Sequence, residues 1–316
     1  MRLVFLGTGE FGVGALGALL RGGHEIVAVV SQPDRPAGRG REVRPTPIHA
    51  TAQELGLRHI QAEDVNALDV SEVYAGAEMG VVVAFGQKIG PAILRGLLRG
   101  CVNIHGSLLP KYRGAAPIQR AIIDGEQTTG VTVFQLNERW DAGAVWGQSS
   151  TSIRETETAD ELHDRLAEFG AALIVDTLAA IETGRARPIE QDATLTTRAP
   201  KLTKADGVVD WSQPAPRIVR RIHGLWSWPA AACTFASRGG KQERVLLARA
   251  EVADLISRPA DEFLAGAFCG DGTVQAGEGR VRLLEVRPAG GKLMSYAAFA
   301  NGRRVGPGDR LVMADT

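Results

Sequence analysis

The sequence predicts an α/β fold in which a Rossmann-like, mostly parallel sheet is followed by a small OB-like β-barrel. Two patterns in its 316 residues support this prediction. In the first half, short continuous apolar runs alternate with helical segments, as in a parallel sheet that is buried on both faces. Beyond residue 225, short strands are separated by Gly and Pro, which is typical of a small antiparallel barrel or sandwich.

Apolar spacing gives the expected order of the elements, because buried strands are continuous apolar runs and helices repeat every three to four residues. The expected strands of the first part are Leu3–Leu6, Glu25–Ser31, Gly80–Phe85, Cys101–His105 and an alternating strand from Thr132. The expected helices there are Phe11–Leu20, Thr46–Gly56, Pro91–Arg99 and Thr158–Ile181, the last opening with a capping box. In the second part, a helix over Pro214–Leu225 precedes strands over Ala230–Ser237, Val245–Ala250, Val274–Ala276 and Val281–Val286.

A polar segment with two prolines separates the two parts. It covers residues 187–205 and has no apolar period, so it predicts a linker between a domain at 1–186 and a domain at 206–316. No apolar run is long enough for a membrane span, and the N-terminus lacks the pattern of a signal peptide. The three cysteines are far apart, which argues against a metal site or a disulfide framework. We therefore expect a cytoplasmic protein.

Charge is unevenly distributed along this neutral chain. Residues 1–200 carry 19 Lys and Arg against 24 Asp and Glu, whereas residues 201–316 carry 17 against 12. A basic second domain fits a polyanionic partner, although chance variation along the chain explains the asymmetry equally well.

The turn after the first strand, Gly7–Gly12, matches the G-x-G-x-x-G pattern of dinucleotide-binding sites. Such a site needs an acidic residue at the end of the second strand, but that strand ends in Ser31-Gln32. Glu10, inside the turn, would also repel a pyrophosphate. A tight structural turn is therefore the favoured interpretation, and dinucleotide binding is the alternative.

The most informative polar residues lie at the end of an expected strand. Asn103 and His105 are two residues apart on that strand, so their side chains leave the same face, at the edge where open α/β sheets bind ligands. Asp141 follows a later strand, in a loop with Gly143. An amide, an imidazole and a carboxylate that met in space would suit polar catalysis, but sequence alone does not bring Asp141 to His105.

Longer motifs carry a resemblance to a known family. NIHGSLLPKYRGAAPIQ, which begins at Asn103, and the later D-x-G at Asp141 resemble the signature of the folate-dependent formyltransferases. QPDRPAGRG from Gln32, KLTK…DW from Lys201 and PAGGKLMS from Pro288 resemble the branch of that family that acts on methionyl-tRNA. Two departures are the extra glycines of the first turn and the residues 137–140, which are usually smaller or more apolar in the family.

The resemblance implies a reaction and its residues. A formyl group would pass from 10-formyltetrahydrofolate to the α-amino group of initiator methionyl-tRNA, without a metal or a covalent intermediate. Asn103 would donate to the oxyanion, and His105 would take the proton of the amine or help to hold the oxyanion. Asp141, if it is hydrogen-bonded to the imidazole, would fix its tautomer and raise its pKa. The residues expected on the folate side are Phe85, Gly86, Ser107, Leu108, Leu109 and Pro110.

The acceptor would be recognised by arginines. The loop Pro33–Pro45 holds four of them, and Arg39 matches the arginine that probes the acceptor stem in this branch of the family. The residues expected to contact tRNA are Arg39, Arg41, Lys201, Lys204, Arg217, Arg220, Arg221 and Arg303. For each of them alone, a solvated surface position is the competing interpretation. We expect the protein to act as a monomer.

Three other functions compete with tRNA formylation. An N-formyltransferase for an amino sugar nucleotide would use the same three catalytic residues but would not need the arginine loop. A dinucleotide-dependent oxidoreductase would use the glycine-rich turn. A catalytically silent RNA-binding module would not need Asn103, His105 and Asp141 together.

Overall fold

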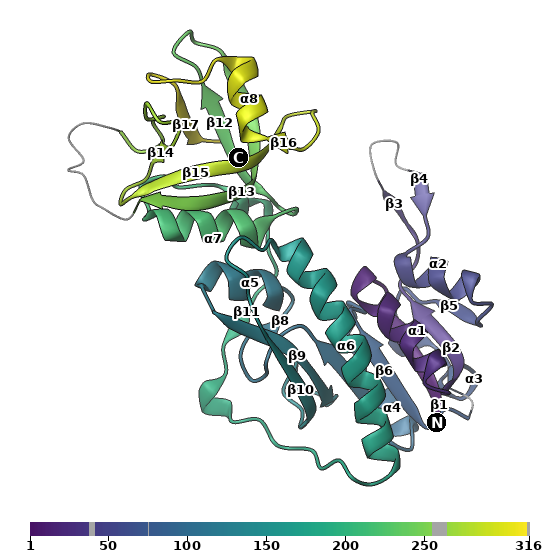
Figure 1. Cartoon of the computed structure of the whole chain (residues 1–316). Helices are drawn as coiled ribbons and strands as arrows, with labels where there is room; N and C mark the ends of the chain where they lie inside the picture. Colours follow the sequence, from purple (N-terminus) through teal and green to yellow (C-terminus); the bar gives the residue numbers. More distant parts are fainter. Residues whose placement is uncertain (38–41, 75, 255–263, 315–316) are drawn as a thin grey trace. The chain divides into compact units, whose positions relative to one another are not determined.

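A computed structural model describes residues 1–37, 42–74, 76–254 and 264–314 (Figure 1). The chain forms two compact units. The first consists of Met1–Pro117, Thr129–Thr151 and His163–Ala199, and the second of Ile118–Thr128, Ser152–Leu162 and Pro200–Thr316. Among the described helices, none is both long and apolar enough to cross a membrane.

The first unit is built on a seven-stranded sheet. In spatial order its strands are β10 (Val145–Ser152), β9 (Thr128–Gln135), β7 (Cys101–His105), β6 (Met79–Val83), β1 (Arg2–Gly7), β2 (Glu25–Ser31) and β5 (His59–Gln61). The five strands from β7 to β5 are parallel, and β9 pairs antiparallel to β7. This arrangement confirms the predicted Rossmann-like, mostly parallel sheet.

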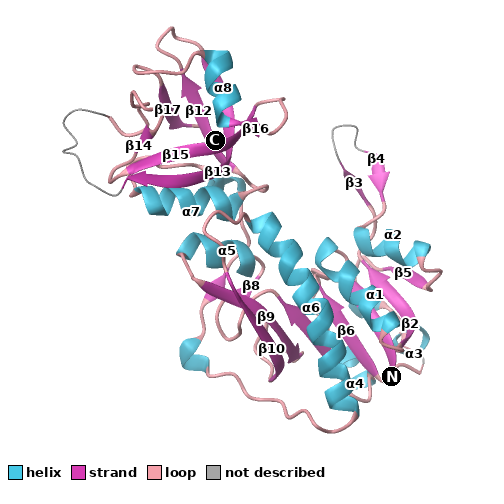
Figure 2. Cartoon of the chain, in the orientation of Figure 1, coloured by secondary structure: helices cyan, strands magenta, loops and turns pink. Residues whose placement is uncertain are grey.

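Helices cover both faces of this sheet (Figure 2). The helical segments of the first part are η1 (Glu10–Gly12), α1 (Val13–Arg21), α2 (Pro47–Glu54), η2 (Val65–Ala67), α3 (Val70–Val73), α4 (Pro91–Gly96), α5 (Pro117–Asp124) and α6 (Ala159–Glu182). Alternate residues of β1 serve opposite faces: Val4 and Leu6 pack in a core with Ile93 of α4. On the other face, α6 lies against β7, since a Cβ added to Gly170 would lie 2.9 Å from the Ile104 side chain.

The glycine-rich turn has a packing explanation. A Cβ on Gly7 would lie 2.7 Å from the ring of Phe5 and 3.0 Å from the carbonyl oxygen of Val83, and one on Gly12 would lie 3.2 Å from Ile48. The backbone of Gly9 donates to the carbonyl of Ala84. Close packing of the turn on β6 and α2 therefore accounts for these glycines, as the structural interpretation of the turn requires.

The segment after α6 differs from the expected linker. It contains η3 (Ala193–Leu195), β11 (Arg198–Ala199) and η4 (Lys204–Gly207), and β11 pairs in parallel with β8 (Arg113–Gly114). The lack of an apolar period was a poor guide here, because the segment is held by backbone hydrogen bonds rather than by an apolar face. The division at 186 and 205 remains a prediction.

A two-stranded hairpin, β3 (Arg35–Ala37) and β4 (Glu42–Arg44), extends from the end of β2 (Figure 1). Its base is closed by Asp34, which accepts a hydrogen bond from Thr46 N at 3.0 Å and lies 2.9 Å from Nδ1 of His49. The His49 ring stacks on His59 of β5 at 4.2 Å. Burial opposes the charge of Asp34, but the hydrogen bonds from His49 and Thr46 outweigh burial and lower its pKa.

The second unit is a nearly closed antiparallel barrel with one long helix. Its elements are α7 (Ala215–Leu225), β12 (Ala231–Ala236), β13 (Gln242–Asp254), β14 (Val274–Gln275), β15 (Arg280–Pro288), β16 (Met294–Ser295), α8 (Tyr296–Arg303) and β17 (Arg310–Met313). The sheet runs β14-β15-β13-β12-β17. Bridges from Ala267 to Arg310 and from Phe268 to Val274 join its two edge strands, which confirms the predicted barrel.

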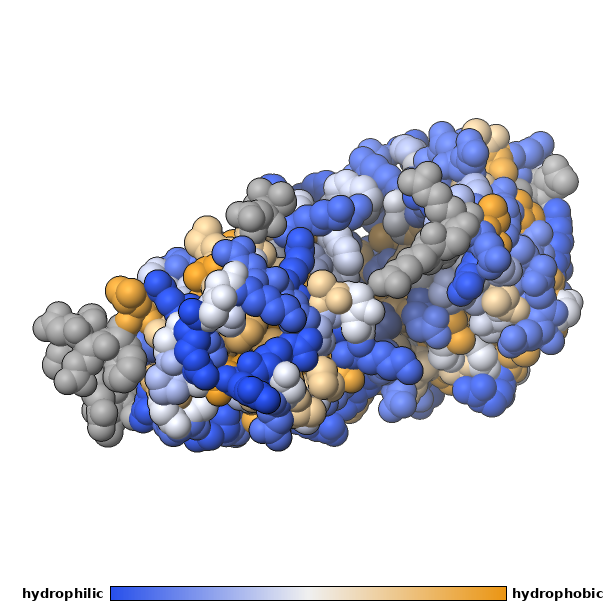
Figure 3. All heavy atoms as spheres, turned by 90° about the horizontal axis from the view of Figure 1, so that it is seen from above, coloured by the Kyte–Doolittle hydropathy of each residue, from blue (hydrophilic) through white to orange (hydrophobic). Residues whose placement is uncertain are grey.

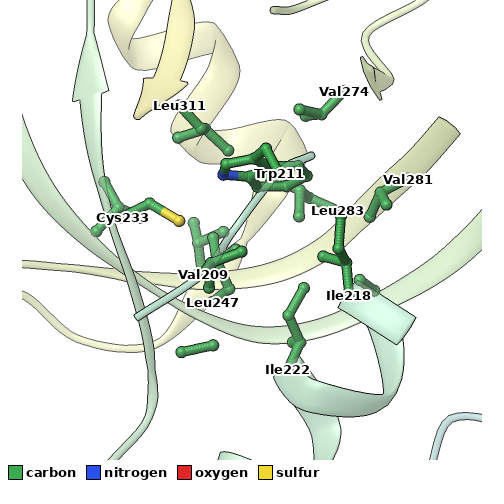
Figure 4. Close-up of a cluster of buried hydrophobic side chains, with 14 of the residues drawn as sticks. Val209, Trp211, Ile218, Ile222, Cys233, Leu247, Val274, Val281, Leu283 and Leu311 are labelled. Carbon is green, nitrogen blue, oxygen red and sulfur yellow. The ribbon is translucent and has the colours of Figure 1, made fainter. Parts of the chain in front are cut away.

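Trp211 lies at the centre of the barrel core. Its side chain is surrounded by Val209, Leu247, Leu283 and Leu311, with α7 adding further apolar side chains (Figure 4). The neighbouring Asp210 caps the turn that follows by accepting from Ser212. The Asp210-Trp211 end of the KLTK…DW motif therefore serves the core of this unit, whereas Lys201 and Lys204 are exposed.

Arg249 of β13 joins two acidic residues within the second unit. Its guanidinium lies 2.6 Å from Glu161 and 2.9 Å from Glu285. Burial alone would raise the pKa of Glu161, but hydrogen bonds from Arg249 and from the backbone and hydroxyl of Thr158 lower it from 4.5 to about 2. The bond between Thr158 and Glu161 is the predicted capping box, which is confirmed.

Replacing Arg249 with Met should therefore reduce the acid dependence of stability. A carboxylate whose pKa is lowered on folding stabilises the protein above its unfolded pKa, near 4.5, and this contribution is lost as the pH falls towards 2. Since half of the Glu161 side chain is exposed, this effect is small. We expect the free energy of unfolding to fall on acidification by about 1 kcal/mol less in the variant than in the wild type. Urea unfolding at pH 6 and pH 3 measures it. Arg282→Met, which breaks the exposed pair with Glu251, is the control and should behave like the wild type.

Candidate active site

The parallel sheet brings Asn103 and His105 to the carboxyl end of β7. Their register fixes this placement, since Asn103 lies between Val82 of β6 and Phe134 of β9. Asn103 is half-buried and no hydrogen bond to another described residue occupies its side-chain amide. His105 is buried, and its ring packs edge-on against Phe134. The two side chains share one face of the strand, as predicted.

The tautomer of His105 follows from its hydrogen bond to the backbone of Tyr112. Nε2 lies 2.9 Å from the carbonyl oxygen of Tyr112, in a buried contact. A carbonyl only accepts, so Nε2 carries the proton and donates it. In the neutral ring, Nδ1 then carries the lone pair and is the basic nitrogen.

Asp141 is held by the same segment that holds His105. Its Oδ2 accepts from the backbone N–H of Gly114 at 2.8 Å, two residues beyond Tyr112. Asp141 has a φ of 49° and Tyr112 a φ of 60°, both in the left-handed region. The segment 112–114 therefore links the imidazole and the carboxylate, which come from chain positions 36 residues apart.

This arrangement corrects one expectation. Asp141 was expected to fix the tautomer if its carboxylate bonded to the imidazole, but within the described chain the carboxylate bonds to Gly114 and the imidazole to Tyr112. The carbonyl of Tyr112 therefore selects the tautomer. This role is not predictable from the sequence, because a backbone carbonyl at a left-handed turn has no counterpart in the side-chain pattern.

Thr132 and Gln148 hold the loop after His105, and sequence analysis missed both. Thr132 Oγ1 donates to the carbonyl of Ser107 at 2.6 Å and accepts from Leu109 N at 3.1 Å. Gln148 donates to Leu109 O at 2.8 Å and to Thr132 at 3.0 Å. Thr132 is the direct partner of His105 in the β7–β9 pair. This pairing is the signal that could have identified Thr132, once the register of the two strands was known.

The residues expected on the folate side fall into two groups. Phe85, Ser107 and Leu109 are buried, and the Ser107 hydroxyl donates to Lys111 O at 2.7 Å. The carbonyl of Phe85 accepts from Thr8 and from Gln32. Leu108 and Pro110 are half-buried, and Gly86 has a φ of 78°. Of these six residues, Gly86 is exposed, Leu108 and Pro110 keep part of their surface exposed, and the other three are buried.

The residues expected to contact tRNA also separate. Arg39 and Arg41 lie outside the described residues. Lys201, Lys204 and Arg217 are exposed, on a molecule whose visible face is mostly hydrophilic (Figure 3).

The remaining three arginines are engaged within the second unit. Arg303 forms a two-pronged bond with Glu243 at 2.7 and 2.8 Å and lies over Phe299. Arg221 donates to the carbonyl of Asp206, and burial lowers its pKa. Arg220 packs closely against Gly125. These contacts give Arg220, Arg221 and Arg303 structural roles that helical spacing alone did not indicate.

The comparisons with known proteins identify the family of both halves of the chain. Residues 1–178 match the formyl transferase family and residues 201–304 match the formyl transferase C-terminal domain. The crystal structure of WlaRD, a sugar 3N-formyl transferase, superposes with a TM-score of 0.66 at 16% identity, covering 90% of this chain and 97% of that one. At this identity the likeness concerns the fold alone.

Sequence relatives match over nearly the whole chain. The methionyl-tRNA formyltransferase of Heliobacterium modesticaldum is 43% identical, and the alignment covers 98% of this chain and 99% of the relative. The methionyl-tRNA formyltransferase of Moorella thermoacetica is 42% identical with the same coverage. The chain belongs to the methionyl-tRNA formyltransferase family.

Proposed function

We propose that this protein transfers the formyl group of 10-formyltetrahydrofolate to the α-amino group of initiator methionyl-tRNA. Full-length identity above 40% with methionyl-tRNA formyltransferases is the observation that carries the proposal. An amino sugar nucleotide is the alternative acceptor, and its support is weaker because the sugar N-formyltransferase resembles this chain only in fold. We further expect a monomer that works in the cytoplasm and needs no metal.

In the proposed reaction, the amine nitrogen attacks the formyl carbon and a new C–N bond forms. Negative charge develops on the former carbonyl oxygen, to which the Asn103 amide donates a hydrogen bond. Nδ1 of His105 accepts the proton that the amine loses. The same proton then passes to the folate nitrogen as the old C–N bond breaks, so that the imidazole ends neutral.

Asp141 has an electrostatic part in this proposal. Its carboxylate is tied to Gly114 N, in the segment whose Tyr112 carbonyl holds the imidazole. In the proposed reaction this negative charge stabilises the imidazolium that forms when His105 takes the proton of the amine. Because the carboxylate has no direct bond to the ring within the described chain, this effect acts through space and through the position of the 112–114 segment.

Replacing Arg39 with Ala tests the acceptor. If the acceptor is initiator tRNA, loss of the Arg39 side chain should lower kcat/KM for charged initiator tRNA by roughly tenfold or more. One arginine contact to a base or phosphate contributes about 1–3 kcal/mol. Initial rates of formyl transfer measure it, with an amino sugar nucleotide as the second acceptor. Arg95→Ala, an exposed arginine paired with Glu138, is the control. Transfer to the sugar nucleotide but not to tRNA would refute the proposed function.

A further inference from the structure

Gln191 lies in the segment that sequence analysis treats as a linker, yet the structure fixes its position closely. Two residues earlier, Ile189 forms a pair of backbone hydrogen bonds with Val145, at 2.7 and 2.8 Å. Directly after it, Asp192 caps η3 by accepting from Thr194. Gln191 is therefore anchored on both sides within the first unit, and its half-buried side chain points back to the Asp141 loop.

The side-chain amide of Gln191 forms four hydrogen bonds. Nε2 donates to the carbonyl of Asp141 at 2.9 Å and to that of Gly143 at 2.7 Å. Oε1 accepts from Nε and Nη2 of Arg113, at 3.1 and 2.6 Å. Two donors and two lone pairs are the full capacity of this group. Its orientation is also fixed chemically, because the reversed amide would set its oxygen against two carbonyls and its NH2 against a guanidinium.

These bonds complete a closed circuit of contacts that includes the carboxylate of Asp141. Gly114 N binds the carboxylate, Arg113 is the residue before it, and Gln191 joins Arg113 to the backbone of Asp141. Asp141 has a φ of 49°, which costs a non-glycine residue about 1–2 kcal/mol and so depends on outside support. Gly143 fits so tightly that a Cβ there would lie 1.7 Å from Gln135 O.

Gln191 also determines the partner of Arg113. Nε and Nη2 of the guanidinium both donate to a neutral amide oxygen, although the group is near enough to Asp141 to interact with it electrostatically. Without this acceptor, the two-pronged geometry of arginine suits a carboxylate best, and Asp141 is the nearby one. An ion pair with Arg113 would neutralise the charge that the proposed reaction needs beside the imidazole.

We propose that Gln191 is a positioning residue for the reaction: it holds the Asp141 loop in its left-handed turn and keeps Arg113 off the carboxylate. The inference rests on the proposed function, since it acts through Asp141. It also assigns a part of the active site to the segment between the two domains.

A double-mutant cycle tests this role. We expect Gln191→Leu to lower the single-turnover rate about tenfold at saturating folate and tRNA, because small displacements of catalytic groups cost this much or more. Both KM values should change by less than about threefold, since substrate contacts are retained. In the Asp141→Asn background, Gln191→Leu should lower the rate less than about twofold further, because its effect passes through the carboxylate.

The controls separate the two proposals. Gln275→Leu removes a similar amide fork, onto the carbonyls of Ala276 and Gly279 in the barrel, and should leave the rate unchanged. If Gln191→Leu does not fold, Gln191→Glu enters the same cycle; it can accept from Arg113 but repels the two carbonyls. Equal effects of the Gln191 variant in both backgrounds, or no effect in either, overturn this inference alone. A wild-type rate for Asp141→Asn removes the role of Asp141 as well.

Discussion

His105→Ala and Asn103→Ala should each lower the single-turnover rate of formyl transfer by about 10²–10³, without loss of the fold. The loss of one oxyanion donor has this effect in other acyl-transfer enzymes, and the loss of a general base has a similar one. Both residues lie at the end of a strand whose backbone pairs on either side, so truncation leaves the sheet intact. Rapid quench with preformed enzyme, folate and charged tRNA measures the rate.

Two further variants give this prediction its controls. His105→Gln keeps a side-chain N–H for the carbonyl of Tyr112 but has no basic nitrogen, so it should be about as slow as His105→Ala. A rate near the wild type would mean that the imidazole only holds the loop, and the proposed proton transfer would be wrong. His163→Ala, which removes a histidine paired with Asp164 on α6, should leave the rate unchanged.

Trp211→Ala should destabilise the barrel by about 3–5 kcal/mol, the usual cost of emptying a large aromatic site in a core. Trp211 is only 4% exposed, and apolar residues from β13, β15, β17 and α7 surround it. Hydrogen exchange of the β13 amides, followed by mass spectrometry, measures the free energy of opening in this unit separately from the first unit.

Trp228→Ala is the matched control, because its side chain is 53% exposed in the same unit. We expect it to lower the opening free energy of β13 by less than about 1 kcal/mol, as exposed substitutions do. If the β13 amides are equally protected from exchange in both variants, Trp211 is not the centre of the core. A Trp211→Ala variant that keeps its stability but loses activity would instead place this residue in a binding surface.

The sequence predicted the elements better than their ends. The helix expected over Pro91–Arg99 ends at Gly96, since Leu97 is already extended. The strand expected to reach Phe85 ends at Val83, because Ala84 and Gly86 have positive φ values that break the ladder. Apolar periodicity reports which residues are buried, and it does not record where a backbone turns.

The same limit applies to the candidate site. Asn103 and His105 could be paired from sequence because they share one strand and its two-residue period places them on one face. The carbonyl of Tyr112 and the hydroxyl of Thr132 could not be found in this way. Each acts through contacts between segments of the chain that only folding brings together.

By itself, the sequence determined the class of fold and the two-domain order and proposed three polar residues for the site, because burial periods and local motifs are properties of neighbouring residues. The tertiary structure decided which atoms these residues meet. It paired the imidazole of His105 with the carbonyl of Tyr112, the carboxylate of Asp141 with the N–H of Gly114, and the carbonyl of Asp141 with the amide of Gln191. Hydrogen bonds are short and directional, so their partners depend on how distant segments pack and not on the order of residues along the chain.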